Sequence, residues 1–187
     1  MSDSLFFIAL LPNLEIQQEV TAFKNEAAKN FEASKALNSP PHITLQAPFR
    51  WGLRNLDVLK QSLLDFSNNQ KKIFLHLDGF DCFRPKTIFV KVEPNDDLTR
   101  LQGELENYLA TALGLEKRSQ RNFHPHMTVA FRDLRREKFD NAWAYFSSLA
   151  YQRFFEADRL SLLQHNGKFW EIREKNLFRF KYGKVNK

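Results

Sequence analysis

A five-residue stretch, Pro41-His42-Ile43-Thr44-Leu45, returns later in the chain as Pro125-His126-Met127-Thr128-Val129. Each copy reads proline, histidine, apolar residue, threonine, apolar residue. Successive side chains of a β-strand point to opposite faces, so the histidine and threonine of each copy share one face and the two apolar residues share the other. The pattern therefore predicts two strands that are anchored by their apolar residues and present an imidazole and a hydroxyl on the opposite side.

The sequence around the two copies repeats as well. Phe7 and Pro12 correspond to Phe89 and Pro94 at an interval of 82 residues, and the two motif histidines lie 84 residues apart. Both halves of the chain read strand, helix, histidine strand, helix, strand. This shared order indicates an internal duplication.

The duplication predicts the architecture. We expect an α+β fold in which a single bilobal domain covers residues 1–187, with half one at about 1–83 and half two at about 84–187. The two lobes are expected to be antiparallel sheets with helices outside, related by a pseudo-twofold axis. This axis would place the two histidine strands face to face across a central cleft.

Hydrophobic periodicity and chain-breaking residues place the expected elements. Strands are expected at residues 5–11, 42–46, 72–77, 87–92, 125–129, 154–157, 160–163 and 169–172, the last two joined by a turn at Asn166-Gly167. Helices are expected from Asn13 to about Phe31, after Asn55 through Phe66, from Asn95 or Asp96 to Gly114, and from Arg135 to Ser148. Asparagine before a helix is a favoured cap, and glycine is a natural stop.

The composition is that of a soluble globular protein with a basic character. Hydrophobic residues make up 43% of the chain, and the formal net charge is +6, which favours polyanionic partners such as RNA. The single cysteine, Cys82, excludes an internal disulfide and suits a reducing compartment. The apolar stretch 5–11 is too short to span a bilayer and lacks the features of a signal peptide. We therefore expect a cytoplasmic monomer with no membrane association.

Two histidines and two threonines form the candidate site. Histidine titrates near neutrality, so two imidazoles on either side of one phosphorus atom suit an in-line displacement. One would take a proton from the attacking water or hydroxyl, and the other would protonate the leaving oxygen. The hydroxyls of Thr44 and Thr128 would donate hydrogen bonds to the non-bridging phosphate oxygens. This scheme needs no metal or other cofactor, and it leaves open whether His42 or His126 is the base.

Other interpretations of the same residues are open. Both motif histidines could be structural strand histidines left by the duplication. His124 stands two residues before His126, so these two and His42 could together bind a metal, although neither motif contains a carboxylate or cysteine. The cleft could also bind an RNA end or a nucleotide without catalysis. Aromatic residues near the motifs could stack on a base or pack in the core: Phe49, Phe131 and Trp170.

The extended motifs Pro41-His-Ile-Thr-Leu-Gln-Ala-Pro-Phe49 and Phe123-His-Pro-His-Met-Thr-Val-Ala-Phe131 resemble the two signatures of the two-histidine (2H) phosphoesterase superfamily. The most similar branch contains the bacterial RNA 2′,5′-ligase-like proteins and cyclic nucleotide phosphodiesterases. The resemblance implies a bilobal duplicated fold and activity on 2′,3′-cyclic phosphates at RNA or nucleotide ends, with ATP-independent 2′,5′ joining in some members. It further implies that His42 and His126 are the acid–base pair and that Thr44 and Thr128 bind phosphate.

One departure from the family pattern concerns positive charge. Some members follow the second motif directly with a basic residue, whereas here Phe131 precedes Arg132. Strand alternation could then turn Arg132 away from the cleft. Three candidates for the additional charge at the phosphate are Lys86, Arg50 and Arg132.

Overall fold

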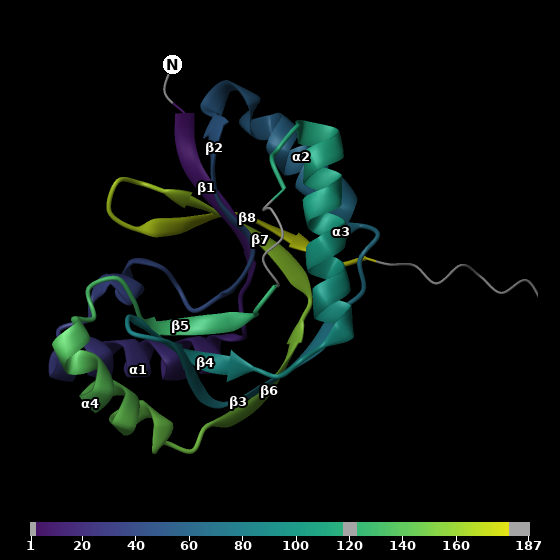
Figure 1. The fold of residues 1–187 in the computed structure, drawn as a ribbon. Helices are drawn as coiled ribbons and strands as arrows, with labels where there is room; N and C mark the ends of the chain where they lie inside the picture. Colours follow the sequence, from purple (N-terminus) through teal and green to yellow (C-terminus); the bar gives the residue numbers. More distant parts are fainter. Residues whose placement is uncertain (1–2, 118–122, 180–187) are drawn as a thin grey trace, which may run out of the picture.

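The computed structural model describes residues 3–117 and 123–179, whose strands form two four-stranded antiparallel sheets (Figure 1). The first sheet has the order β2-β1-β7-β8, with β2 at Ile43–Gly52, β1 at Asp3–Leu10, β7 at Arg159–His165 and β8 at Trp170–Leu177. The second has the order β5-β4-β3-β6, with β5 at His126–Ala130, β4 at Thr87–Val92, β3 at Ile73–Phe83 and β6 at Gln152–Ala157. The predicted α+β class with two antiparallel sheets is confirmed.

The longer helices cover the two sheets in pairs (Figure 1). They are α1 at Leu14–Phe31, α2 at Leu56–Ser67, α3 at Asp96–Leu113 and α4 at Arg136–Ser147, and two short 3-10 helices are η1 at Lys35–Asn38 and η2 at Leu53–Asn55. Helices α2 and α3 pack on the first sheet, whereas α1 and α4 pack on the second. Among the described helices, none is both long and apolar enough to cross a membrane.

Each sheet contains strands from both halves of the sequence. Strand β3, the last strand of the half at about 1–83, pairs with β4 of the next half. Strand β7 correspondingly pairs with β1. Helix α1 follows β1 of the first sheet, yet it packs on β5 of the second. The division near residue 83 therefore separates the two sequence repeats but not the two lobes. Each lobe contains strands from both halves of the sequence.

Strand β1 is buried on both of its faces. Phe6, Ile8 and Leu10 are fully buried in the main core. The alternate residues of the strand, Phe7 and Ala9, belong to a smaller apolar cluster with Leu163, against which Trp170 packs. Because side chains alternate along a strand, this second cluster lies on the face of the first sheet that is turned away from the main core.

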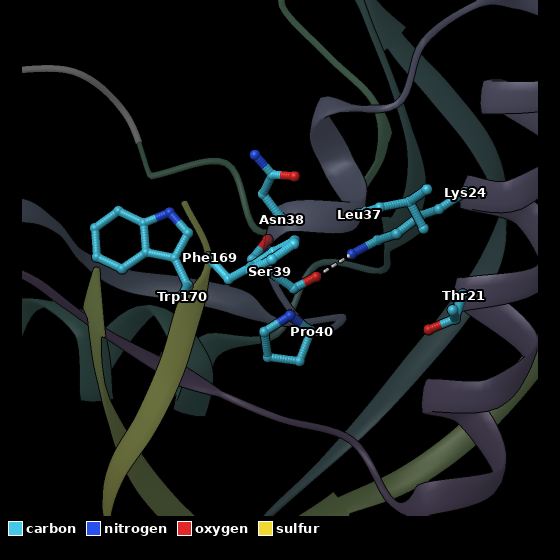
Figure 2. A pocket seen from close by; sticks show the side chains of 8 residues that line it. All are labelled: Thr21, Lys24, Leu37, Asn38, Ser39, Pro40, Phe169 and Trp170. Carbon is cyan, nitrogen blue, oxygen red and sulfur yellow. Dashed lines mark hydrogen bonds between the residues drawn. The ribbon is translucent and has the colours of Figure 1, made fainter. Parts of the chain in front are cut away.

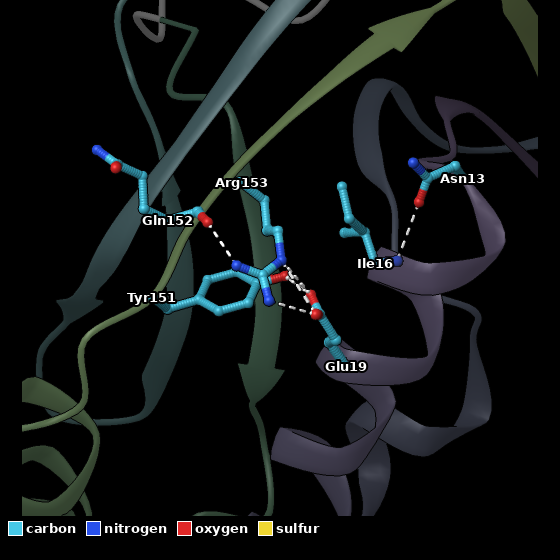
Figure 3. A network of polar contacts seen from close by, with 6 residues as sticks. All are labelled: Asn13, Ile16, Glu19, Tyr151, Gln152 and Arg153. Carbon is cyan, nitrogen blue, oxygen red and sulfur yellow. Dashed lines mark hydrogen bonds and ion pairs between the residues drawn. The ribbon is translucent and has the colours of Figure 1, made fainter.

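Helix α1 is fixed on the second sheet by a polar network (Figure 3). Its start is capped by Asn13, whose Oδ1 accepts the N–H of Ile16 at 3.0 Å. One turn further, the Glu19 carboxylate accepts hydrogen bonds from Arg153 Nη2 at 2.6 Å and the Tyr151 hydroxyl at 2.9 Å. The Arg153 hydrogen bond is the main cause of a lowered pKa at Glu19. This network fixes where the following turns of α1 lie.

Most expected elements are present, with differences at their ends. The caps Asn13 and Asn95 and the left-handed stop at Gly114 are as predicted, whereas the side chain of Asn55 makes no capping hydrogen bond at the start of α2. Strand β3 continues beyond residue 77 to Phe83, because a bulge near Gly79, with φ +67°, bends the strand without ending it. Strand β2 begins at Ile43, so its histidine lies just before the strand. The turn between β7 and β8 spans four residues, from Asn166 to Phe169.

Candidate active site

The two motif histidines lie at matching ends of two edge strands. His42 immediately precedes β2 and His126 is the first residue of β5. Each of these strands is the outer strand of its sheet, and the two strands approach each other. The predicted alternation is present in both motifs, since the histidines and threonines are partly exposed while the residues between them are buried: Ile43, Leu45, Met127 and Val129.

The two threonines share a face with the aromatic residues beneath the site. Thr44 is the register partner of Ala9 on β1, and Thr128 is the register partner of Phe89 on β4. Residues directly opposite each other in an antiparallel pair point to the same face of the sheet. The Thr44 hydroxyl is therefore on the face of the first sheet that carries the smaller apolar cluster. The Thr128 hydroxyl is on the face of the second sheet that carries Phe89.

Both imidazoles are held in the same way by the backbone. The Nδ1 atom of His42 lies 2.7 Å from the carbonyl oxygen of Pro40, and the Nδ1 atom of His126 lies 2.8 Å from the carbonyl oxygen of His124. A carbonyl oxygen can only accept, so Nδ1 carries the hydrogen in each contact. In the neutral ring the lone pair is then on Nε2, which is the tautomer that a general base requires.

Each imidazole also rests on an aromatic pair. The ring of Phe7 is 4.7 Å from that of His42, and Trp170 contacts Phe7 edge-on at 4.6 Å. On the other side, Phe89 is 4.9 Å from His126, and Phe83 is 4.6 Å from Phe89. Phe7 and Phe89 are the repeated pair that the sequence shows, so the duplication preserves the support of the imidazole as well as the imidazole itself.

Partial burial makes both histidines difficult to protonate. Loss of solvent is the main reason why the pKa of His42 falls to about 4, and the nearby charges of Lys24 and His126 lower it further. Burial also lowers the pKa of His126, to which the charge of His124 adds. The carbonyl contacts act in the opposite direction, because they stabilise the protonated rings.

Comparison with known families identifies this arrangement. A sequence model of the family described as the 2′-5′ RNA ligase superfamily matches residues 12–169. The chain belongs to this superfamily. The matched range includes both histidine motifs and the helices between them, and it confirms the resemblance that the motifs indicate.

Individual relatives agree with the superfamily assignment. A candidate phosphoesterase of Geobacillus sp. (strain WCH70) is 33% identical over 129 residues, which is 68% of this chain and 68% of that protein. A second candidate phosphoesterase, from Geobacillus kaustophilus (strain HTA426), is 32% identical over 129 residues, again 68% of each chain.

Solved structures share the fold at low sequence identity. TT0787 of Thermus thermophilus superposes with a TM-score of 0.72 at 17% identity, covering 95% of this chain and 100% of that one. LigT of E. coli, solved with 3′-AMP, has a TM-score of 0.68 at 15% identity and covers 95% and 99% of the two chains. These neighbours establish the two-lobed fold for this member of the superfamily.

The three basic residues that the sequence offers as phosphate ligands are surface groups. Lys86, Arg50 and Arg132 are exposed. Arg132 adopts φ +62° just after β5, and its guanidinium lies 4.9 Å from the centre of the Phe131 ring. The cation whose charge acts on the pKa of His42 is instead Lys24.

Lys24 was missed in the sequence, although a signal is present there. The buried face of α1 carries Ile16, Val20, Lys24 and Ala27. Lysine at a position four residues after Val20 and three before Ala27 interrupts an otherwise apolar stripe, and a charge on such a stripe is unusual. Reading the helix only for its hydrophobic residues hides this signal.

His124 lies beside His126, whereas His76 and His165 contact other aromatic residues. His124 is exposed, with its ring centre 6.4 Å from that of His126. Among the described residues, no group of three or more histidine, cysteine, aspartate or glutamate side chains is arranged to hold a metal ion. His76 stacks on Phe154 at 4.2 Å, and His165 meets Trp170 edge-on at 4.9 Å.

The three aromatic candidates for base stacking occupy different environments. Phe49 is partly buried and packs against the core, with its ring 6.3 Å from that of Phe6. Phe131 is 37% exposed and is in contact with Arg132. Trp170 packs beside Phe7 on the His42 side of the site. Of the three, Trp170 is therefore linked to a motif histidine through a single intervening ring.

Proposed function

We propose that this protein is a metal-independent phosphoesterase that hydrolyses 2′,3′-cyclic phosphate ends of RNA or small nucleotides by two-histidine acid–base catalysis. The observation that carries this proposal is the paired environment of His42 and His126. Each ring donates Nδ1–H to a backbone carbonyl, keeps Nε2 available and has a threonine two residues ahead on the same face. Two such groups on facing edge strands suit opposite sides of one phosphorus atom.

The difference in environment assigns the two proton-transfer roles in this proposal. His42, whose pKa is lowered to about 4, stays neutral over a wider pH range and would act as the base. Its Nε2 would take the proton of a water molecule as the water oxygen bonds to phosphorus. His126 would give a proton from Nε2 to the ribose oxygen as its bond to phosphorus breaks, leaving a phosphomonoester.

The threonine hydroxyls complete the proposed site. Thr44 and Thr128 would donate hydrogen bonds to the non-bridging oxygens, where negative charge has to be held as the displacement proceeds. The same groups would serve the joining direction. A 5′-hydroxyl in place of water would attack the cyclic phosphate and form a 2′,5′ linkage, with the same two proton transfers.

The solved relatives support nucleotide binding. E. coli LigT has been solved with 3′-AMP, with ATP and with NADP+. We extend nucleotide binding to this chain because the fold is shared. We further propose that residues 1–187 act as one bilobal domain, since the interlocked sheets leave neither half with a sheet of its own.

Product analysis with single variants tests the proposal. The protein is incubated with a nucleoside 2′,3′-cyclic phosphate and with an oligonucleotide that ends in one, with and without EDTA, and the products are assigned by phosphorus NMR. We expect EDTA to have no effect and His42→Ala and His126→Ala each to abolish turnover with an unchanged circular dichroism spectrum. His76→Ala is the matched control, because His76 packs on Phe154 away from the motifs.

Two results would separate this proposal from simple binding. Turnover that survives in either motif variant would refute acid–base catalysis by the pair. Binding of the cyclic nucleotide without any product would instead indicate a non-catalytic RNA-end or nucleotide-binding module. That alternative has one observation in its favour, since burial lowers the pKa of both histidines and so disfavours the protonated ring that an acid needs.

A further inference from the structure

A cavity of about 200 Å³ opens beside the His42 motif, between α1, η1 and the turn from β7 to β8 (Figure 2). One wall is aromatic, with Phe169 and Trp170. The remaining wall is formed by six residues, four of which have polar side chains: Thr21, Lys24, Asn38 and Ser39, with Leu37 and Pro40 as the apolar two. The cavity therefore combines a flat apolar side with a side that can donate hydrogen bonds.

Lys24 is the unusual member of this lining. Its side chain is only 2% exposed, and Nζ donates a hydrogen bond to the carbonyl oxygen of Ser39 at 2.9 Å. Within residues 3–117 and 123–179 no carboxylate forms an ion pair with it, and the rest of the chain contains no aspartate or glutamate. An ammonium has three N–H donors, and a buried charge without a counter-ion is costly. An anion in the cavity would remove that cost.

The cavity is adjacent to the proposed phosphorus site but separate from it. The Lys24 ammonium and the His42 imidazole are held by consecutive carbonyls of the segment before β2. The Ser39 carbonyl accepts from Lys24, and the Pro40 carbonyl accepts from His42. On the opposite wall, Trp170 contacts Phe7, which in turn contacts His42. His42 itself does not line the cavity. A ligand that fills both places would thus present one group to the histidines and another to Lys24.

We propose that this cavity binds a second phosphate of the substrate, on the 5′ side of the nucleotide that carries the cyclic phosphate, with Lys24 as its cation. This inference rests on the proposed function and narrows its substrate class. Oligonucleotide ends and 5′-phosphorylated nucleotides would be preferred over nucleosides whose only phosphate is the cyclic one. The aromatic wall would lie against the ribose or base that joins the two phosphates.

The chemistry of the lining supports an anion in particular. Burial lowers the pKa of Lys24 to about 7, so its ammonium readily loses a proton. A phosphate beside it would stabilise the charged form and add a charge-assisted hydrogen bond. Figure 2 shows the Lys24 side chain crossing toward the Ser39 carbonyl, with the Asn38 side chain on the other side of the same turn.

Kinetics on matched substrates test the subsite. The initial rates of the wild-type protein, Lys24→Met and Lys24→Arg are compared on a nucleoside 2′,3′-cyclic phosphate, its 5′-phosphorylated form and a dinucleotide that ends in the same group. For the wild type we expect kcat/KM to be about tenfold to a hundredfold higher when the 5′-side phosphate is present, the range for one hydrogen bond to a charged group. Lys24→Met should bring this ratio close to one, mainly through KM, and Lys24→Arg should retain part of it.

The two phosphorylated substrates separate the possible sources of the group. A higher kcat/KM with both phosphorylated substrates indicates that any 5′-side phosphate is recognised. A higher kcat/KM with the dinucleotide alone indicates that an internucleotide linkage is recognised. Lys29→Met is the matched control, because it removes an exposed positive charge from the same helix and should leave the ratio unchanged. A wild-type ratio near one, or a ratio that survives in Lys24→Met, would overturn the subsite while leaving the phosphoesterase proposal intact.

A binding measurement keeps the subsite testable if no substrate is turned over. Titration calorimetry compares a nucleoside 3′,5′-bisphosphate with the corresponding 3′-monophosphate. The wild type should bind the bisphosphate about tenfold or more tightly, and Lys24→Met should bind the two alike. Absence of turnover together with this difference would reject catalysis but support the subsite. Equal affinities in the wild type would reject the subsite.

Discussion

The two sides of the site are built alike but are enclosed differently. On both sides an imidazole donates Nδ1–H to the carbonyl two residues before it and rests on a phenylalanine. On the His42 side, however, the adjoining wall contains a cavity with a buried lysine, and the pKa of the histidine falls to about 4. On the His126 side the neighbouring residue is the exposed His124. Burial and nearby charge, more than the motif itself, distinguish the two histidines.

This difference shows how a duplicated motif can supply two unlike groups. Identical backbone contacts give both imidazoles the same tautomer and orientation. Desolvation and the charge of Lys24 lower the pKa of His42, which keeps its ring neutral, as the proposed base requires. In this proposal the duplication provides the geometry, and the residues around each copy would determine its role.

The largest expected effect separates the base from the acid. His42→Gln and His126→Gln should each lower kcat for a 2′,3′-cyclic nucleotide by about 10²–10⁴-fold, the contribution of a positioned general acid or base. On an aryl phosphodiester such as bis(4-nitrophenyl) phosphate, the leaving oxygen needs no proton. His126→Gln should then lose far less activity than on the cyclic nucleotide, while His42→Gln should remain as impaired. Steady-state rates on the two substrates provide the measurement.

The reverse result would exchange the roles. If His42→Gln recovered on the aryl ester and His126→Gln did not, the less buried histidine would be the base. Equal losses for both variants on both substrates would show that neither assignment follows from burial.

The next largest effect concerns stability on the His42 side. Burial lowers the pKa of Lys24 in the folded protein from 10.5 to about 7. Below about pH 7 the folded state therefore carries the full free-energy cost of the buried ammonium. Between about pH 7 and 10.5 only the unfolded chain is protonated at this lysine, so the cost falls as the pH rises. Lys24→Met should raise the free energy of unfolding by about 2–5 kcal/mol at pH 6, at about 1.4 kcal/mol per pKa unit.

The pH dependence is the diagnostic part of this measurement. The advantage of Lys24→Met should shrink as the pH approaches 10, which urea unfolding at several pH values would detect. Lys29→Met should show no such trend, because Lys29 is exposed. A constant difference between wild type and Lys24→Met across that range would mean that Lys24 keeps its proton in the folded protein.

A smaller stability effect compares the two histidines directly. His42 titrates near 6.5 in the unfolded chain and at about 4 in the folded protein, so its contribution to stability is lost as the pH falls from 6.5 toward 4. The loss should reach up to about 3 kcal/mol. In His42→Gln this loss should disappear, and His126→Gln should remove a part of the acid sensitivity as well, because burial lowers the pKa of His126 too. Unfolding curves between pH 4 and 7 that are parallel for all three proteins would contradict the burial of these rings.

Local sequence patterns were sufficient for the elements and for the face on which each motif residue lies. Asn13 and Asn95 cap helices because their side chains accept backbone N–H groups within one turn, which depends only on nearby residues. The alternation of His42 and Thr44 with buried residues follows from the two-residue period of a strand. These features require no knowledge of the rest of the fold.

Contacts across the chain could not be read in the same way. The strand order does not follow from the repeat. Strand β3 pairs with β4, which comes next in the sequence, whereas β7 pairs with β1 from the other end of the chain, and that choice depends on packing between distant segments. The cavity beside Lys24 needs α1, η1 and the β7–β8 turn together. A lysine on an apolar stripe can be noticed in the sequence, but what surrounds its ammonium is decided by tertiary structure.

The smallest expected effect tests a contact that joins the two sides. Asp133, just after the His126 motif, accepts hydrogen bonds at Oδ2 from the backbone N–H groups of Ser34 at 2.8 Å and Lys35 at 2.9 Å. It thereby caps the helix η1 that forms part of the cavity beside Lys24. Asp133→Ala should lower the free energy of unfolding by about 0.5–2 kcal/mol, as loss of a cap does. Asp133→Asn keeps an acceptor and should lower it less.

Asp133→Ala should also weaken binding of a nucleoside 3′,5′-bisphosphate more than binding of the 3′-monophosphate. The reason is that the cavity loses support while the two motif histidines keep their backbone contacts. Equal weakening of both ligands would mean that Asp133 supports the whole cleft, and the two sides would then not be independent.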